Sequence, residues 1–231
     1  MDDLLNSNRD FDGVIKRNIV SLRRSEDLFD DLTDGDATLT RLAQSLEANV
    51  KQLIPTGIIA RSFHYTTAVE YPFVREPYLM SRYGNGSHPV WYGALDLETT
   101  IHETCYHMVR EERRIEGHHE TIYRERAVYD VDGRAILIDL VGKEQHYPAL
   151  IEESYHFTQP LGQRMYDEGH PGLIAPSARH RGGENAIIFR QNMLTNPRVT
   201  CYLNYLYSAT DNTVIVERTS GETLITLRYP R

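Results

Sequence analysis

The sequence predicts an α+β fold, in which a compact mixed sheet with flanking helices follows a helical N-terminal extension. Segments of strand character cluster in groups and do not alternate strictly with helical segments, as they would in an α/β protein. The chain has 231 residues, 40% hydrophobic and 25% charged, which is enough for one large core. Residues 1–55 hold 11 acidic and 7 basic residues, against 22 and 18 in residues 56–231, so each part carries a net charge of −4. We therefore expect a domain boundary near residue 55.

The extension, residues 1–55, predicts two helices joined by an acidic loop. One helix is expected over residues 14–22, and residues 25–36, with six acidic side chains, predict the loop. Apolar residues then recur at helical spacing and form one stripe that ends before Pro55: Leu39, Leu42, Ala43, Leu46, Val50 and Leu53. Such a stripe usually packs against the main body, and the alternative is a docking surface for a partner.

The first half of the main body predicts strands around one long helix. Strands are expected over residues 57–63 and 89–94. Asp96 has the residue type of an N-cap and predicts a helix from residue 97 to about residue 116. The next strand signals predict a hairpin over residues 123–140, with its turn at Asp132-Gly133.

In the second half of the body, the sequence predicts four shorter elements. They are a helix over 161–168, buried strands over 173–175 and 186–189, and a last hairpin over 213–227. The loop between the two buried strands is rich in serine, arginine, glycine and asparagine. No internal repeat or low-complexity tract interrupts the body.

Composition excludes several classes of protein. No apolar run approaches the ~18 residues of a membrane span, and the acidic start does not resemble a secretory signal. The two cysteines, Cys105 and Cys201, are too few for a disulfide framework or a cysteine-based zinc site. The net charge of −8 argues against direct binding of nucleic acid. We therefore expect a cytoplasmic protein without a membrane partner.

Residues 102–107, with the sequence HETCYH, are close to the zinc motif H-E-x-x-H but one residue too long. His102 and His107 are five residues apart, which is about 140° around a helix, so one helix cannot direct both at one ion. We therefore predict no metal site here. Glu103 is a candidate catalytic carboxylate, since it lies near the start of a helix that follows a strand.

The loop after the first buried strand gathers polar side chains suited to an anionic ligand. Ser177 and Arg179 can donate hydrogen bonds to phosphate or ribose oxygens, and Asn185 adds an amide. Gly182 and Gly183 permit backbone conformations that expose N–H groups. From composition alone, an ordinary surface loop is the better explanation of these residues.

Two arginines and two tyrosines earlier in the chain support this loop. Arg61 ends the first strand of the body, and Arg82 and Tyr83 open a turn that leads into the strand of Tyr92. Each is a weak signal alone. The sequence has no P-loop, no dinucleotide fingerprint and no G-x-S-x-G elbow, and Cys105 is interpreted as a packing residue.

Taken in order, these segments resemble the RES domain, a family named for its arginine, glutamate and serine. The resemblance runs from about Ile58 to about Phe189 and is strongest in residues 172–185, GLIAPSAR followed by GGEN. Four further positions match in order: Arg61, Arg82, Tyr92 and Glu103. Ser81 and Tyr83 depart from the family's Gly-Arg-Trp pattern around the second arginine.

The resemblance implies a fold similar to ADP-ribosyltransferase toxins and a catalytic domain over residues 56–231. It also implies cleavage of the nicotinamide–ribose bond of NAD+, by hydrolysis or phosphorolysis, with NAD+ as substrate, phosphate as a co-substrate in the second case, and no bound cofactor. The implied catalytic residues are Glu103, Arg82 and Ser177. The implied substrate-binding residues are Arg61, Tyr92, Tyr83, Arg179 and Asn185.

Members of the family are best known as toxins of bacterial toxin–antitoxin pairs, so the resemblance implies a cognate antitoxin or immunity protein as partner. Two alternatives stay open. The first is an ADP-ribosyltransferase that modifies a protein. The second is a non-enzymatic interaction module with a degenerate site.

Overall fold

The computed structural model describes residues 2–21, 65–74, 76–115 and 121–230, which fold around one eight-stranded sheet. The strands are β1 (Asn8–Val20), β2 (Trp91–Ala94), β3 (Thr121–Asp139), β4 (Gly172–Pro176), β5 (Glu184–Ile188), β6 (Leu194–Ser208), β7 (Thr213–Thr219) and β8 (Glu222–Arg228). The helices and helical turns are η1 (Asp2–Leu5), η4 (Thr66–Glu70), α4 (Tyr71–Val74), α5 (Leu97–Glu112), η5 (Lys143–Gln145), η6 (Pro148–Leu150), α6 (Thr158–Asp167) and η7 (Gln191–Met193). β3 and β4 pair in parallel and the other neighbours pair antiparallel, so the sheet is mixed. The predicted α+β class is confirmed.

Five of the strands close into a ring. They pair in the order β1–β2, β2–β5, β5–β4, β4–β3 and β3–β1. β1 lies in register with β3 along its whole length, and it meets β2 where Lys16 faces Ala94. Ile15, Trp91 and Leu137 are fully buried in the cluster of apolar side chains that this ring surrounds.

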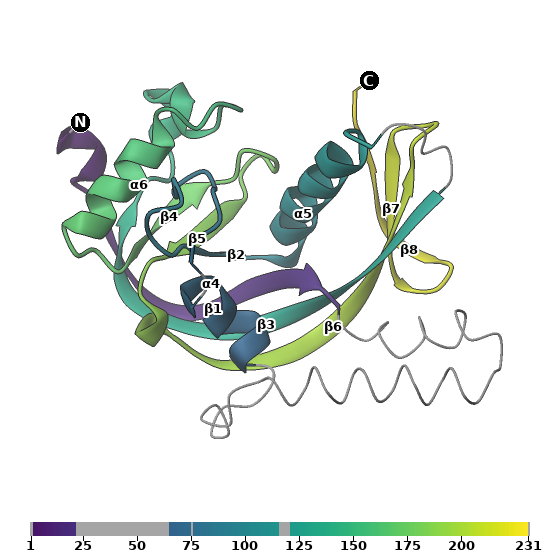
Figure 1. Cartoon of the computed structure of the whole chain (residues 1–231), viewed down its shortest axis with the longest axis horizontal. Coiled ribbons are helices and arrows are strands. Elements are labelled where there is room, and N and C mark those ends of the chain that lie inside the picture. The colour runs from purple at the N-terminus through teal and green to yellow at the C-terminus, as the bar shows by residue number, and fades with distance from the viewer. Residues whose placement is uncertain (1, 22–64, 75, 116–120, 231) are drawn as a thin grey trace.

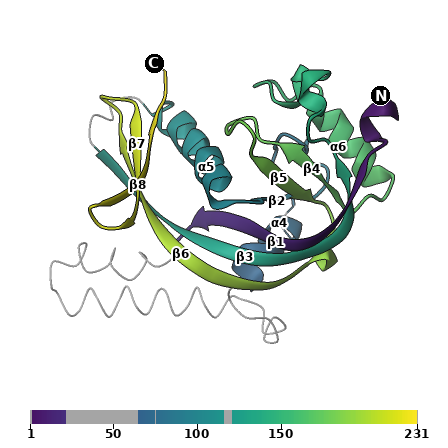
Figure 2. The same ribbon diagram turned by 180° about the vertical axis from the view of Figure 1, so that it is seen from behind.

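Helix α5 lies on the concave side of the long strands β3 and β6, as Figures 1 and 2 show from opposite sides. Its buried face carries Ile101, Cys105, Met108 and Val109, which recur at helical spacing and pack against side chains of β3, β6 and β7. This packing fixes the rotation of the helix, so that the polar face of its first turns is directed away from the sheet.

Helix α6 packs on β4 and β5, where Leu161 and Met165 join a second buried cluster with Leu173. The turn at residue 83 lies directly on this helix. A Cβ atom on Gly162 would stand 2.0 Å from the carbonyl oxygen of Tyr83, so the close approach requires glycine at position 162.

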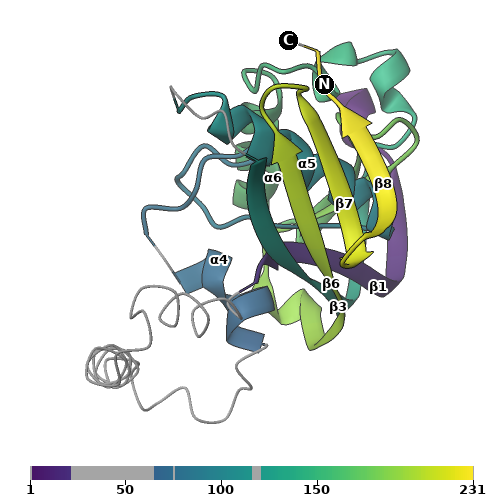
Figure 3. The same cartoon turned by 90° about the vertical axis from the view of Figure 1, so that its right-hand side faces the viewer.

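The C-terminal hairpin extends the sheet beyond β6, and Figure 3 shows β6, β7 and β8 side by side. Val214 and Val216 of β7 point into the core with α5 and are fully buried. The hairpin predicted over residues 213–227 is therefore confirmed, with β7 and β8 paired from Thr213 opposite Arg228.

The helix predicted over residues 14–22 is wrong, because residues 8–20 form β1. Burial in this segment alternates as in a strand: Ile15 is fully buried, whereas its neighbour Val14 is 38% exposed. The segment is a strand because it pairs with β3, a partner far away in the chain. The acidic loop and the apolar stripe lie outside the described residues, so the boundary at residue 55 stays a prediction.

The hairpin predicted over residues 123–140 is also wrong, because β3 runs without a turn from Thr121 to Asp139. Gly133 pairs with Gly13 of β1 in regular register. A Cβ atom on Gly133 would stand 2.7 Å from Cδ1 of Ile15, so glycine here makes room for a side chain that crosses the strand.

The elements with local signals are confirmed. β2, β4 and β5 lie where strands are predicted, α5 ends four residues before its predicted end at residue 116, and α6 begins three residues before its predicted start at residue 161. The strand predicted over residues 57–63 lies outside the described part. β6 has no counterpart in the sequence analysis. Among the described residues, no helix is both long and apolar enough to cross a membrane.

Candidate active site

Helix α5 begins directly after β2 and is fixed at its start by Asp96. The Asp96 carboxylate accepts hydrogen bonds from the backbone N–H of Thr99 and from the Thr99 hydroxyl, both at 2.7 Å. This is the N-cap that the sequence predicts. Glu103 lies two turns into the helix and is half-buried, beside the buried face that packs on the sheet.

The carboxylate of Glu103 is held by two donors that come from the loop after β4 and from β5. The hydroxyl of Ser177 and the amide of Asn185 each donate a 2.7 Å hydrogen bond to Oε1 of Glu103. Within the described residues, Oε2 accepts no hydrogen bond. One oxygen therefore fixes the carboxylate, and the other is left for a ligand.

Ser177 organises its own loop as well. Its oxygen accepts hydrogen bonds from the backbone N–H groups of Arg179 and His180, at 3.1 and 3.0 Å. The Ser177 N–H donates to the carbonyl oxygen of Gly183, which closes the loop. The hydroxyl proton goes to Glu103 and orients its carboxylate, while both lone pairs of the oxygen accept backbone N–H groups, so none is left for nucleophilic attack.

The loop touches the first turn of α5 at Gly183. A Cβ atom at this position would stand 2.2 Å from the hydroxyl oxygen of Thr99, whose side chain is fully buried. Gly182 is different: it has open space around it and a φ of 84°, a backbone conformation that favours glycine. Glycine is therefore required at 183 by a close contact and favoured at 182 by the backbone conformation.

Asn185 is placed by the centre of the sheet. β5 lies between β2 and β4, and Asn185 is opposite Ala94 on one side and Ala175 on the other. Since β2 and β4 both pair antiparallel with β5, their C-terminal ends lie at the same edge of the sheet, on either side of Asn185. Ser177 follows the end of β4, and α5 follows the end of β2. The sheet therefore brings together three side chains that are far apart in sequence.

Tyr92 and Tyr83 support the turn before β2. The Tyr92 hydroxyl accepts a hydrogen bond from the Tyr83 N–H at 2.8 Å and donates to the Ser81 hydroxyl at 3.0 Å. Tyr83 is 1% exposed, and its hydroxyl has no hydrogen-bond partner in the described part of the chain. Burial raises the pKa of both phenols, so both are neutral near pH 7. Tyr83 is thus shielded from solvent, Tyr92 is half-buried, and their role in substrate binding stays a prediction.

The arginines Arg82 and Arg179 both approach the segment around residues 150–153, at and after the end of η6. Nη1 of Arg82 donates to the carbonyl oxygens of Leu150 and Glu152, at 3.1 and 2.7 Å. Nη1 of Arg179 lies 3.9 Å from the carboxylate of Glu153. Arg61, the third predicted arginine, lies outside the described residues.

Arg179 is held over α5 by a residue that the sequence analysis did not single out. Its guanidinium carbon lies 3.4 Å from the ring centre of Tyr106, and only 12% of its side chain is exposed. Tyr106 follows Glu103 by three residues, so the two share one side of the helix. This spacing is a signal that sequence alone could have given.

Arg17 of β1 is a second residue that the sequence analysis missed. It donates from Nη1 to the carbonyl oxygen of Tyr92, and its guanidinium lies 5.2 Å from the ring centre of Trp91. Burial lowers the pKa of Arg17 to about 10. No motif in the sequence points to Arg17, because its contact with Tyr92 depends on the pairing of β1 with β2.

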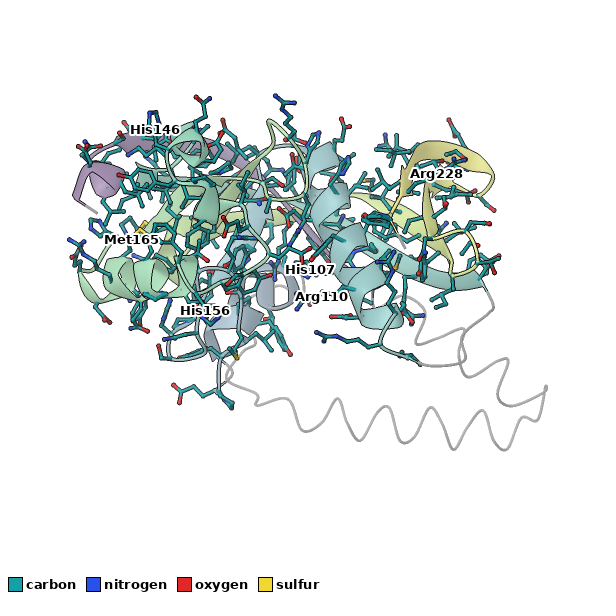
Figure 4. All side chains as sticks on the ribbon, turned by 90° about the horizontal axis from the view of Figure 1, so that it is seen from above. His107, Arg110, His146, His156, Met165 and Arg228 are labelled. Atoms are coloured by element: carbon teal, nitrogen blue, oxygen red, sulfur yellow. The ribbon has the colours of Figure 1, made fainter. Side chains whose placement is uncertain are left out.

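One surface depression lies away from these side chains. It has a volume of about 640 Å³ and is lined by Asn85 and by residues of α6 and its C-terminal end. Its lining includes none of the predicted site residues. The site is therefore defined by the side chains around Glu103: Ser177, Asn185 and the Arg179–Tyr106 pair. Side chains around α5, including the labelled His107 and Arg110, are drawn in Figure 4.

The fold and the site together define an α+β domain in which a helix-borne glutamate is held by a serine and an asparagine from a strand–loop–strand segment. The family model for the RES domain matches residues 50–208, more than half of the chain. The chain therefore belongs to the RES domain family.

No match was found among curated proteins. Among solved structures, the chain is similar to a chain in the crystal structure of the M. tuberculosis MbcT–MbcA toxin–antitoxin complex. That similarity covers 85% of this chain and 86% of the other, with a TM-score of 0.42 and 10% sequence identity.

Proposed function

We propose that this protein is a NAD+-consuming toxin that cleaves the bond between nicotinamide and ribose, by hydrolysis or phosphorolysis. The proposal rests on membership of the RES domain family. The observation that carries it is the carboxylate of Glu103, with Oε1 fixed by Ser177 and Asn185 and with Oε2 left for a ligand.

The chemistry needs a carboxylate in a fixed position. When the C–N bond to nicotinamide breaks, its electron pair leaves with nicotinamide and positive charge develops on the ribose carbon. A carboxylate already oriented toward that carbon stabilises the charge without reorganisation during the reaction. Water or phosphate then adds to the carbon, and the products are ADP-ribose or its phosphate ester.

The arginines suit the pyrophosphate of NAD+. Within the described residues, the hydrogen bonds of Arg82 come from Nη1, so its Nε and Nη2 keep free donors. Arg179 stacks on Tyr106 and uses none of its side-chain donors in a hydrogen bond to a described residue. Arginine presents such donors in a planar arrangement that matches phosphate oxygens. A cognate antitoxin that covers this side of α5 would keep NAD+ from Glu103.

The proposal is tested with purified protein by following nicotinamide release from NAD+, with and without phosphate. We expect Glu103→Gln to lower kcat by roughly 10²-fold or more, because the amide keeps the shape but loses the charge. Glu111→Gln, an exposed glutamate on the same helix, is the matched control and should keep wild-type turnover.

The same experiment separates the alternatives. Product that forms without any added protein supports NAD+ cleavage, and the dependence of its chemical form on phosphate identifies the nucleophile. Nicotinamide release that requires a protein acceptor would instead indicate an ADP-ribosyltransferase. Full activity of Glu103→Gln would contradict the assignment of the site.

A further inference from the structure

Beside Glu103, on the outer side of α5, a second group of side chains converges. Nε2 of His102 lies 3.9 Å from Oε1 of Glu98, and Nε2 of His180 lies 3.8 Å from the same oxygen. The two imidazole rings are parallel within 5°, with their centres 4.6 Å apart. One potential ligand atom from each of the three residues lies within 4.8 Å of the others.

The neighbours of His180 determine which of its two ring nitrogens carries the proton in the neutral imidazole. The Thr99 hydroxyl donates its only proton to Asp96, at 2.7 Å, and it lies 2.8 Å from Nδ1 of His180. Toward the histidine this hydroxyl oxygen must therefore accept, which places a proton on Nδ1. In the neutral imidazole, Nε2 then carries a lone pair, and this lone pair lies on the side of Glu98.

We propose that Glu98, His102 and His180 bind a divalent transition-metal ion such as Zn²⁺. Two imidazole nitrogens and one carboxylate oxygen are a ligand set that zinc accepts, with a fourth position open to water. Donors at Zn–ligand distances of about 2.0–2.2 Å in tetrahedral geometry stand about 3.3–3.6 Å apart. To reach this geometry, the two stacked imidazoles must tilt so that both lone pairs point at one ion, because the three ligand atoms are now within 4.8 Å of one another. Oε1 of Glu98, at 3.9 and 3.8 Å from the two Nε2 atoms, must approach each by about 0.2–0.6 Å. Glu98 can make this movement because its side chain is 60% exposed.

The support behind His180 is also typical of a metal ligand. In metal sites the other nitrogen of a ligating histidine usually donates to a polar group that fixes the tautomer and the ring orientation. Here Thr99 takes this role and is itself held by Asp96. Thr99 is fully buried, so the support does not depend on a mobile surface side chain.

This site differs from the pair of histidines that the sequence analysis examined. His107 is exposed and is not part of the group. The second histidine of the proposed site is His180, from the loop after β4, so the spacing of histidines along α5 could not have predicted it. An ion here would join the helix that carries Glu103 to the loop that carries Ser177.

Zinc binding is measured on the untagged full chain by competition with a chromogenic chelator, and with Co²⁺ by its visible absorption. We expect one equivalent of Zn²⁺ to bind, and the affinity to fall by at least roughly 10²-fold in His102→Ala and in His180→Ala, since each loses a ligand. Thr99→Val should weaken binding about 10-fold to 100-fold, because it removes only the support behind His180. His146→Ala changes an exposed histidine that lies away from α5 in Figure 4 and should bind as the wild type does.

Circular dichroism of each variant identifies any that does not fold, and Glu98→Gln provides a further variant at an exposed position. Unchanged affinity in folded His102→Ala, or equal losses in His146→Ala, would overturn the proposal, as would the absence of stoichiometric binding by the wild type. The measurement does not depend on NAD+ cleavage, so it can succeed or fail separately from the proposed function.

Discussion

At the scale of single residues, the orientation of one carboxylate depends on two small side chains. Ser177 and Asn185 both donate to Oε1 of Glu103, and neither is held by the other. If the two donors serve only to orient the carboxylate, losing one already allows Glu103 to rotate. The effect of losing the second should then be smaller than the effect of losing the first.

This gives a prediction for a double-mutant cycle. We expect Ser177→Ala and Asn185→Ala each to lower kcat for NAD+ cleavage by roughly 10-fold to 10²-fold, and the double variant to lose much less than the product of the two. Initial rates of nicotinamide release give kcat and KM for all four proteins. Ser208→Ala, at the end of β6 and outside the site, serves as the control. Losses that simply multiply would show that the two residues act independently.

The adjacent glycines of the loop give a second prediction at this scale. Gly183→Ala places a methyl group against Thr99 and should reduce the free energy of unfolding by about 1–3 kcal/mol. Gly182→Ala meets no neighbour and should reduce it only through backbone strain, about 1 kcal/mol.

Urea denaturation of both glycine variants, of Thr99→Ala and of the double variant Gly183→Ala/Thr99→Ala tests the cause. The double variant removes both Thr99 atoms that the new methyl group would meet and leaves only Nδ1 of His180, at 2.9 Å, so its loss should be less than the sum of the losses of Gly183→Ala and Thr99→Ala. Additive losses would show that the methyl group is accommodated without contact with Thr99.

At the scale of elements, signals that act within a few residues gave correct predictions. Asp96 predicts the start of α5 because an N-cap needs only the backbone three residues ahead. The motif places Ser177 and Asn185 close together in sequence, and in the structure Ser177 follows β4 while Asn185 lies in β5, opposite Ala175. Only the structure shows that both side chains donate to the same oxygen of Glu103.

Elements that depend on distant partners were predicted wrongly or not at all. β1 was interpreted as a helix because its pairing with β3 is not visible in its own residues. β6 has no predicted counterpart, although Val199, Leu203 and Tyr205 lie on alternate positions of this strand. Gly133 was interpreted as a turn, whereas it makes room for Ile15.

The strand assignment of β1 leads to a stability prediction. Ile15→Ala should lower the free energy of unfolding by about 2–5 kcal/mol, since the side chain is fully buried within the ring of strands. Val14→Ala is the matched control on the opposite face and should change it by no more than about 1 kcal/mol. Thermal or urea unfolding measures both. Equal effects of the two substitutions would contradict a strand with alternating burial.

At the scale of the whole molecule, the stability of the fold should depend on pH through a buried histidine. His88 is fully buried between Tyr166 and Phe189, with Nε2 3.2 Å from the carbonyl oxygen of Tyr83. Burial lowers the pKa of this imidazole below its ordinary value of about 6.5. The unfolded chain therefore takes up the proton first as pH falls.

The stability that His88 contributes in its neutral form is thus present above about pH 6.5 and is lost as pH falls toward the lower pKa of the folded state. Urea unfolding between pH 8 and pH 5 should show a steeper loss in the wild type than in His88→Asn. His146→Asn, which changes an exposed histidine, should keep the wild-type slope. A slope that is the same in all three proteins would contradict this assignment.

The closure of the ring by β1 bears on how the chain can be shortened. The family match begins at residue 50, well after β1, although β1 pairs with β3 along its whole length. A fragment that starts at residue 50 would leave one edge of β3 without its neighbour, with a long row of unpaired N–H and carbonyl groups. Such an edge recruits strands from other molecules. The fragment should therefore self-associate or precipitate, whereas the chain that keeps residues 8–20 covers this edge with its own first strand.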